Sequence, residues 1–237
     1  SLQLRGNFKI GSNYTIKIKR GLRANGAILK RDFSTSLTIP NLEPNLRFVG
    51  DGLYLSRDGN LNLGLASMNC NRVQIEIEKV FANNLIYLAS SQDWSEWTRN
   101  LGKIIHSEEI QTDSVLNEEV TTPISLKDYL SDNRIGIFKV TASKADERWR
   151  HAYQWVMMTD LGIMAKKTKD ELWVWVNSLS SLNPIADAQI EVISDNNQTL
   201  LSGTTDADGL VKFESLSEVS EGFAPFAKMP RIIGGRY

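Results

Sequence analysis

Apolar and polar residues alternate along much of the chain, which is the period of a β-strand with one buried face. Tyr14, Ile16 and Ile18 fall on one side of such a segment, and threonine or lysine fills the positions between them. The same period runs through residues 73–78. Less regular apolar runs predict further strands at residues 33–39, 136–141, 151–158, 161–167, 172–179, 188–193, 199–204 and 210–213. Many short strands without alternating helices predict an all-β fold of tandem antiparallel β-sandwiches.

The stretch LWVWV breaks this alternation, because all five of its residues are apolar. Leu172, Val174 and Val176 share one side and are expected to fill the core between two sheets. Trp173 and Trp175 then fall on the opposite side, where a strand normally meets water, and would form a patch that is large for a monomer. A loop of the same domain or a neighbouring domain is expected to cover them. The reverse orientation, with the tryptophans in the core, stays open.

One or two short helices are expected among the strands. Trp94, Trp97 and Leu101 are spaced as on one face of a helix, and Gly102 is suited to end it. A shorter helical turn is predicted for residues 125–130.

Composition narrows the function classes. The chain has 237 residues, which is enough for one large or two ordinary domains. Of these, 41% are hydrophobic and 23% charged, which is typical of a globular protein. Its net charge of −1, with lysine and arginine spread along the chain, argues against nucleic acid as a partner. No apolar run approaches the roughly 20 residues that a membrane helix needs. No signal peptide is visible, and the opening reads like the interior of a domain, so a fragment of a longer protein is expected.

Residues that could carry catalysis or bind a metal are few. His106 and His151 are the only histidines, and neither has a second ligand at a metal-binding spacing, so both are expected to be ordinary surface residues. The sequence DADG from Asp206 begins like a calcium loop but lacks the intermediate ligands, and it is predicted to be a hairpin turn. Cys70, the single cysteine, is expected to be a small, half-buried packing residue. No catalytic, cofactor-binding or metal-binding residue is assigned, and the chain is not expected to be an enzyme.

Several stretches together resemble one family, the bacterial alpha-2-macroglobulins. They are residues 44–85, which open with PNLRFVGDG, and the shorter runs 158–163 (MTDLGI), 175–179 (WVNSL) and 183–188 (NPIADA). The resemblance is most specific around Thr159-Asp160 and weakest between residues 85 and 135. Cys70 stands where the family usually has valine, and Asp187 stands where glycine is common.

The resemblance implies macroglobulin-like sandwiches, of fibronectin- or Ig-like architecture, in three parts. Residues 1–40 would end a second such domain, residues 41–158 would form the third, and residues 159–237 would form the fourth without its last strand. It further implies a structural scaffold from a protease-trapping inhibitor. The family's reactive thioester needs a Cys-x-Glu-Gln motif, which does not occur at Cys70, and no bait region is identifiable.

The resemblance also implies partners and a location. The partners would be neighbouring domains of the same polypeptide and, through the full-length protein, host or competitor proteases; no nucleic acid and no cofactor is expected. The location would be the bacterial periplasm, with the parent protein anchored to the inner membrane as a lipoprotein.

The chain between residues 151 and 167 has no proline, serine or glycine run that could act as a flexible tether. This predicts a rigid, strand-to-strand junction, with Trp155 or the pair Trp173 and Trp175 at an interdomain contact. Two other interpretations stay open. One is a surface adhesin or stalk module, and the other is a carbohydrate-binding module in which Trp173 and Trp175 form an exposed, coplanar platform.

Overall fold

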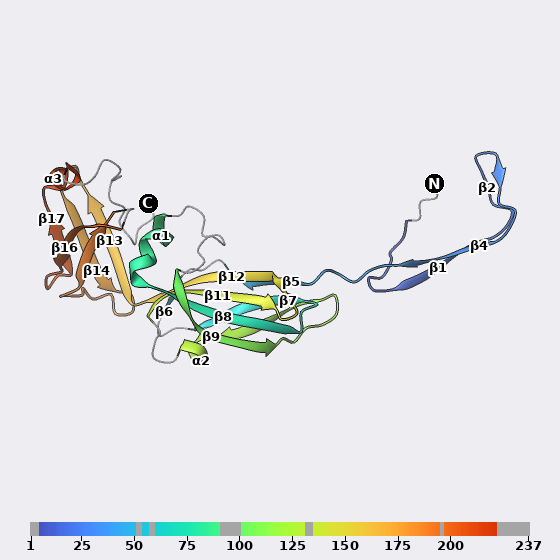
Figure 1. The fold of residues 1–237 in the computed structure, drawn as a ribbon, viewed down its shortest axis with the longest axis horizontal. Helices are drawn as coiled ribbons and strands as arrows, with labels where there is room; N and C mark the ends of the chain where they lie inside the picture. Colours follow the sequence, from blue (N-terminus) through green and yellow to red (C-terminus); the bar gives the residue numbers. More distant parts are fainter. Residues whose placement is uncertain are drawn as a thin grey trace.

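The computed structural model describes residues 5–50, 54–56, 60–90, 101–130, 135–194 and 197–221. Within them, antiparallel strands dominate and the helices are short, so the predicted all-β fold class is confirmed (Figure 1). The helix expected around Trp94 and Trp97 lies outside the described residues. No helix in the described ranges is long and apolar enough to cross a membrane.

The first strands form a narrow ribbon that stands apart from the rest of the chain (Figure 1). Its members are β1 (Asn13–Ile18), β2 (Arg23–Ala24), β3 (Ala27–Ile28) and β4 (Phe33–Thr38). β1 pairs with β4 so that Tyr14 lies opposite Leu37 and Ile18 lies opposite Phe33. The predicted alternation is therefore present, and it gathers the apolar side chains of the ribbon on one face.

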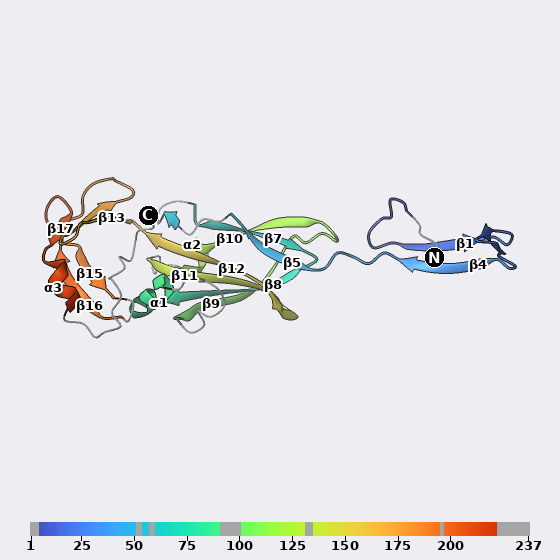
Figure 2. The same cartoon turned by 90° about the horizontal axis from the view of Figure 1, so that it is seen from above.

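The middle unit is a sandwich of a three-stranded and a five-stranded sheet. The first sheet has the order β10 (Glu119–Ser125), β7 (Asn62–Met68), β5 (Asn45–Val49). The second has the order β6 (Tyr54–Ser56), β12 (Glu147–Thr159), β11 (Gly136–Lys144), β8 (Arg72–Val80), β9 (Gly102–Gln111). In Figure 2, the strands of the first sheet lie along one side of this unit and β8, β9, β11 and β12 along the other. Short helices flank the sheets: η1 (Ala82–Asn84), α1 (Leu85–Ser90) and α2 (Leu126–Leu130), the last at the position predicted for a helical turn.

The core of the middle unit lies between these two sheets. Val73, Ile75 and Ile77 alternate along β8 and are fully buried, as the period of two predicts. They pack against aliphatic residues of the facing sheet, including Leu63 and Leu65. The complete buried cluster comprises Leu46, Leu61, Leu63, Leu65, Cys70, Val73, Ile75, Ile77, Ile124, Leu126, Leu130, Phe138, Val140, Ala142, Val156 and Met158.

The last unit also has two sheets, one of three strands and one of two. The first has the order β13 (Leu161–Lys167), β14 (Leu172–Ser178), β17 (Leu210–Phe213), and the second pairs β15 (Gln189–Ile193) with β16 (Thr199–Thr204). A short helix, α3 (Leu216–Glu221), follows. Leu172, Val174, Val192, Val211 and Phe213 form the buried cluster between the sheets.

The turn that starts at Asp206 differs from its prediction. Gly209 has the positive φ of 70° expected of the turn glycine, and Asp206 Oδ1 accepts hydrogen bonds from the Asp208 and Leu210 N–H groups, both at 2.9 Å. However, β16 pairs with β15 and β17 pairs with β14, so the turn connects the two sheets and is not a hairpin. The hydrogen bonds of Asp206 and the positive φ of Gly209 set the local turn, whereas core packing determined which strands pair.

Cys70 is fully buried in the core of the middle unit, where only half-burial was expected. Its Sγ lies 3.8 Å from the Asn45 carbonyl oxygen. Burial raises the pKa of the Cys70 thiol above its ordinary value, although the positive charges of Lys144 and Arg150 partly oppose this. Because the thiolate is the reactive form, both burial and the raised pKa make this residue unreactive.

We therefore predict that Cys70 reacts slowly with a soluble thiol reagent in the folded chain. Addition of urea should release one fast-reacting thiol per chain, measured by the absorbance of the reagent. Rapid stoichiometric labelling without denaturant would contradict the assigned burial.

The end of β11 carries a charged group in a nearly buried position. Lys144 is 9% exposed, and its Nζ lies 2.6 Å from Asp146 Oδ1 and 2.9 Å from Glu147 Oε1. Arg150 Nε donates to Glu147 Oε2 at 2.7 Å. The hydrogen bonds from Lys144 and then Arg150 hold the pKa of the Glu147 carboxyl below its ordinary value. A buried ammonium needs such partners, because an unpaired charge there would be costly.

The lowered pKa of Glu147 predicts a pH-dependent stability. Its contribution is fully present above the ordinary carboxyl pKa and is lost as the pH falls through the lowered native pKa. Glu147→Gln should therefore destabilise the chain at pH 7, and the difference from the wild type should shrink in acid, as measured by urea unfolding. Glu191→Gln, an exposed matched control, should change little. A Glu147→Gln effect that does not vary with pH would refute this assignment.

Candidate functional site

The middle and last units are joined by a single residue outside the strands. β12 ends at Thr159 and β13 begins at Leu161, so Asp160 alone lies between them. A connection this short leaves few free backbone dihedrals between the two sheets. The junction has the strand-to-strand form that the sequence predicted.

The side chain of Asp160 ties the junction to the last unit. Its Oδ2 accepts from the Ser178 hydroxyl at 2.7 Å, and its Oδ1 accepts from the Ser180 N–H at 2.9 Å. The Asp160 carbonyl accepts from the Leu179 N–H at 2.7 Å, and Ser178 Oγ accepts from the Ser181 N–H at 3.0 Å. One carboxylate thus organises the turn that follows β14, and bonds to an ionised acceptor are among the stronger hydrogen bonds.

The other side of the junction is held by the middle unit. β6 pairs in parallel with the end of β12, and the Tyr54 hydroxyl on β6 donates to the Thr159 carbonyl oxygen at 2.8 Å. The Leu161 N–H then donates to Thr159 Oγ1 at 2.9 Å. Thr159 is therefore bonded to both units, and Asp160 to the last unit.

The two faces of β14 are oriented as predicted, which excludes the reverse arrangement. Leu172, Val174 and Val176 are 1–3% exposed and face the core, whereas Trp173 and Trp175 lie half-buried on the opposite side. The two indole rings stack with centroids 6.0 Å apart and an interplanar angle of 23°. This spacing lies in the range of favourable offset aromatic pairs.

Cross-strand neighbours extend this surface, which we call the tryptophan face. Trp175 lies opposite Met164 on β13 and Leu210 on β17, and Met164 is 63% exposed. Trp173 lies opposite Lys166 and Lys212. The tryptophan face therefore has an apolar half, formed by Met164, Trp175 and Leu210, and a half with charged neighbours around Trp173.

The charged half of the tryptophan face is internally paired. Lys212 Nζ lies 4.9 Å from the centroid of the Trp173 ring and also contacts Glu171 Oε1 at 2.8 Å and Glu214 Oε1 at 2.6 Å. Trp173 Nε1 donates to Glu171 Oε2 at 3.1 Å. The hydrogen bond from Lys212, followed by that from Trp173, lowers the pKa of the Glu171 carboxyl. Lys212 thus lies over the Trp173 ring, and this argues against an open platform on which a sugar could stack.

Trp155, the third predicted contact residue, lies in a different cluster. It is 7% exposed on the outer side of the five-stranded sheet, where it packs with Val80 and with Leu88 of α1. Lys139 Nζ lies 5.7 Å from the centroid of its ring. The structure brings Trp173 and Trp175 together but gives Trp155 partners within the middle unit.

The remaining chemistry of the described residues is sparse. No group of three or more histidine, cysteine, aspartate or glutamate side chains in the described ranges could hold a metal ion. His106 stacks on Tyr129, with ring centroids 4.2 Å apart, and His151 is exposed at the rim. The roles of Asp160 and Tyr54 were missed from sequence. For Asp160, the available signal was a single aspartate between two strand-like runs, with serines at the end of the next strand.

A family model and the curated relatives agree on one family. Residues 158–229 match the model of the bacterial alpha-2-macroglobulin MG3 domain. Over an alignment of 207 residues the chain is 30% identical to an alpha-2-macroglobulin homolog of Yersinia pestis. The alignment covers 75% of this chain and 10% of that protein. The chain thus spans about a tenth of its relative. The matched model is described as the MG3 domain, whereas the last part was expected to be the fourth such domain. The three domain boundaries stay predictions.

Solved structures agree on the fold. A Salmonella alpha-2-macroglobulin mutant aligns with a TM-score of 0.61 at 16% identity, over 88% of this chain and 13% of the other. The native Escherichia coli protein, as a crystal structure spanning domains MG0-NIE-MG1, aligns with a TM-score of 0.57 at 16% identity, over 88% and 69% of the two chains.

The junction geometry predicts a specific loss on substitution. Asp160→Ala should lower the free energy of unfolding by about 1–3 kcal/mol, because it removes a charged acceptor from two hydrogen bonds. Urea unfolding monitored by tryptophan fluorescence would measure it. Asp160→Asn, which can still accept, should lose less, and Asp208→Ala, at an exposed turn position, should lose little. Equal stability of Asp160→Ala and Asp208→Ala would contradict the role given to Asp160.

Proposed function

Because the chain belongs to the bacterial alpha-2-macroglobulin family, we propose that it is a rigid scaffold segment of a protease-trapping inhibitor. In this proposal the segment is a run of macroglobulin-like domains and carries no chemistry of its own. It transmits movement between parts of the longer protein when a protease is enclosed.

The observation that carries the proposal is the one-residue junction at Asp160. Two sandwiches that share a nearly continuous strand, with hydrogen bonds from Tyr54 on one side and to Ser178 and Ser180 on the other, have little freedom to swing independently. A trap that closes around a protease needs parts that move as whole bodies, because a flexible chain would absorb the motion. The described contacts suit that requirement.

The proposal assigns no thioester and no enzymatic activity to this segment. A thioester of this family forms from a cysteine followed by Glu-Gln two positions later, and the residues after Cys70 are Asn71, Arg72 and Val73. The burial of Cys70 in the core supports the same assignment. The histidines that could activate a nucleophile make other contacts: His106 stacks on Tyr129 and His151 Nδ1 lies near the Trp149 carbonyl.

We assign the apolar half of the tryptophan face to contact with a neighbouring domain of the same polypeptide. Met164, Trp175 and Leu210 form an apolar surface on a sheet that otherwise has charged neighbours, and such surfaces mark interaction sites. The alignment covers only 10% of the Yersinia pestis relative, so further domains are available as occupants. The carbohydrate-binding interpretation is less supported, because Lys212 lies over the Trp173 ring.

The parent protein is proposed to act in the bacterial periplasm, anchored to the inner membrane through a lipid, with host or competitor proteases as its targets. These assignments rest on the family alone. No nucleic acid is proposed as a partner, since the chain has a net charge of −1 without a concentrated basic run.

A size-selective protease assay tests the proposed function. The full-length parent protein, incubated with an endopeptidase, should block cleavage of a large protein substrate while cleavage of a small peptide substrate continues. The 237-residue chain alone should block neither. Inhibition of both substrates by the isolated chain, or an unchanged rate on the large substrate with the parent, would overturn the proposal.

The scaffold role has its own test within the same assay. Asp160→Ala in the parent should reduce shielding of the large substrate, whereas Asp208→Ala should leave it unchanged. If the Asp160→Ala parent still shielded the large substrate fully, trapping would not depend on the junction.

A further inference from the structure

The linker between the ribbon and the middle unit follows a path without strand or helix pairing, yet it is heavily bonded. It runs from the end of β4 at Thr38 to the start of β5 at Asn45. Linkers without secondary structure usually give two domains independent motion. Here side chains from three separate turns and strands of the middle unit converge on residues 41–44.

Two asparagines hold the first half of the linker. The Leu42 N–H donates to Asn117 Oδ1 at 2.8 Å, and Asn69 Nδ2 donates to the Leu42 carbonyl at 2.7 Å. Asn117 Nδ2 donates to Asn41 Oδ1 at 3.0 Å, and the Asn117 N–H donates to Asn69 Oδ1 at 2.7 Å. Both backbone groups of Leu42 thus bond to amide side chains.

Asparagine is the side chain that this arrangement needs. Asn117 uses its carbonyl oxygen as an acceptor and its amide nitrogen as a donor, so aspartate could not make the same set of bonds. Asn69 and Asn117 have φ values of 52° and 63°, in the left-handed region that asparagine tolerates better than most residues. Turn conformation and side-chain bonding therefore select the same residue at both positions.

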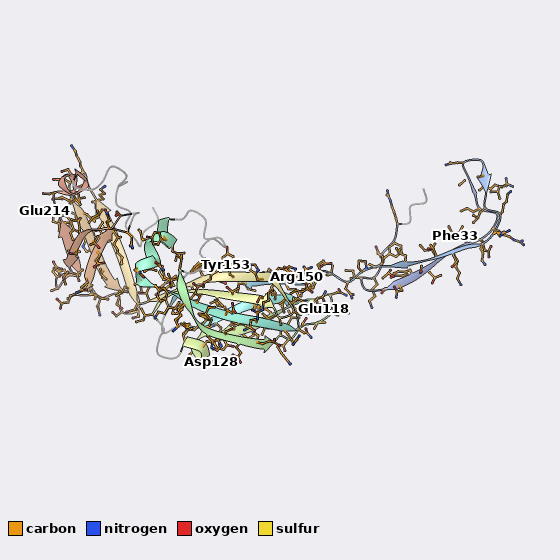
Figure 3. The ribbon with its side chains drawn as sticks, viewed as in Figure 1. Phe33, Glu118, Asp128, Arg150, Tyr153 and Glu214 are labelled. Atoms are coloured by element: carbon orange, nitrogen blue, oxygen red, sulfur yellow. The ribbon has the colours of Figure 1, made fainter. Side chains whose placement is uncertain are left out.

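An arginine holds the second half. Arg150 Nη1 donates to the Pro44 carbonyl at 3.2 Å, and Nη2 donates to Glu43 Oε2 at 2.6 Å. Its Nε donates to Glu147. The guanidinium is thereby oriented by β12 while it binds the linker. Figure 3 shows Arg150 and Glu118 at the end of the middle unit that faces the ribbon. Glu118 is the residue that follows Asn117 in the chain.

The ribbon itself touches this cluster at Gly11. Gly11 has a φ of 71°, its N–H lies 3.4 Å from the Pro40 carbonyl, and a Cβ added to it would lie 2.4 Å from Asn41 Oδ1 and 3.4 Å from Asn117 Nδ2. The ribbon turn therefore lies against the paired amides of Asn41 and Asn117. A residue with a side chain would not fit without displacing them.

We infer that Asn69, Asn117 and Arg150 form a clamp that locks the linker and fixes the ribbon at one angle to the middle unit. The clamp lies at the opposite end of the middle unit from Asp160, and it is a second, chemically different joint. It works through side-chain bonds to a loop, whereas the Asp160 junction works through a nearly continuous strand. The inference is independent of protease trapping, since it concerns the geometry of this chain alone.

The test is a distance distribution between spin labels on the two sides of the clamp. Cysteines replace Ser36 on β4 and Lys103 on β9, both exposed, in a Cys70→Ala background of the full 237-residue chain. Pulsed electron paramagnetic resonance should give one narrow distance peak. The double variant Asn117→Gly with Arg150→Met should broaden that peak at least about twofold, because glycine keeps the left-handed turn while the bonds to the linker are lost.

Asn25→Gly is the matched control, since Asn25 also has a positive φ of 49° but lies in the ribbon between β2 and β3. It should leave the width of the peak unchanged. Cooperative urea unfolding of each labelled variant shows that it is folded, and Arg150→Met alone serves if the double variant does not fold. A folded clamp variant with the wild-type width, or a broad wild-type distribution, would overturn the inference.

Discussion

The arrangement of the two sandwiches depends on one carboxylate at the point where the chain leaves one sheet and enters the next. A strand that continues with a single intervening residue can still bend, because that residue has two free dihedrals. Asp160 removes this freedom by accepting hydrogen bonds from Ser178 and Ser180 of the following strand and turn. Tyr54 fixes the preceding carbonyl from the other side. The tryptophan face, the core strand β14 and the middle sandwich are all positioned relative to this residue.

The two sides of β14 differ in burial. The aliphatic side of β14 fills a core, and its aromatic side remains half-buried at a surface. In the middle unit, by contrast, Trp155 is buried against the unit's own helix α1. Both features suit the proposed scaffold role, because each unit has its own core and the last unit keeps a limited apolar surface.

Alternation and apolar runs predicted β1, β4, β8, β11, β12 and the strands of the last unit, but not β5, β7, β9 or β10. They also predicted the orientation of β14, because successive side chains of a strand point to opposite faces. They failed where tertiary contacts decided the outcome. The Asp206 turn has hairpin chemistry, but its flanking strands pair in different sheets, since Val211 and Phe213 are needed beside Leu172 and Val174 in the core. The hydrogen bonds of Asp160 and of the linker clamp could not be predicted, because they join residues that are far apart in the sequence. The separation is 18 positions for Asp160 and Ser178 and 107 positions for Glu43 and Arg150. The likeness to bacterial alpha-2-macroglobulins was visible in the residues, yet the position of the last domain within that family came only from the matched MG3 model.

The central claim is that the middle and last sandwiches form one rigid body through Asp160. The most direct measurement places spin labels at Lys103 on β9 and at Glu191 on β15, both exposed and on opposite sides of the junction, in the Cys70→Ala background. If the junction is rigid, the distance distribution is single and narrow, and Asp160→Ala broadens it. A broad distribution in the chain with Asp160 intact would show that the junction is a hinge and would contradict the scaffold.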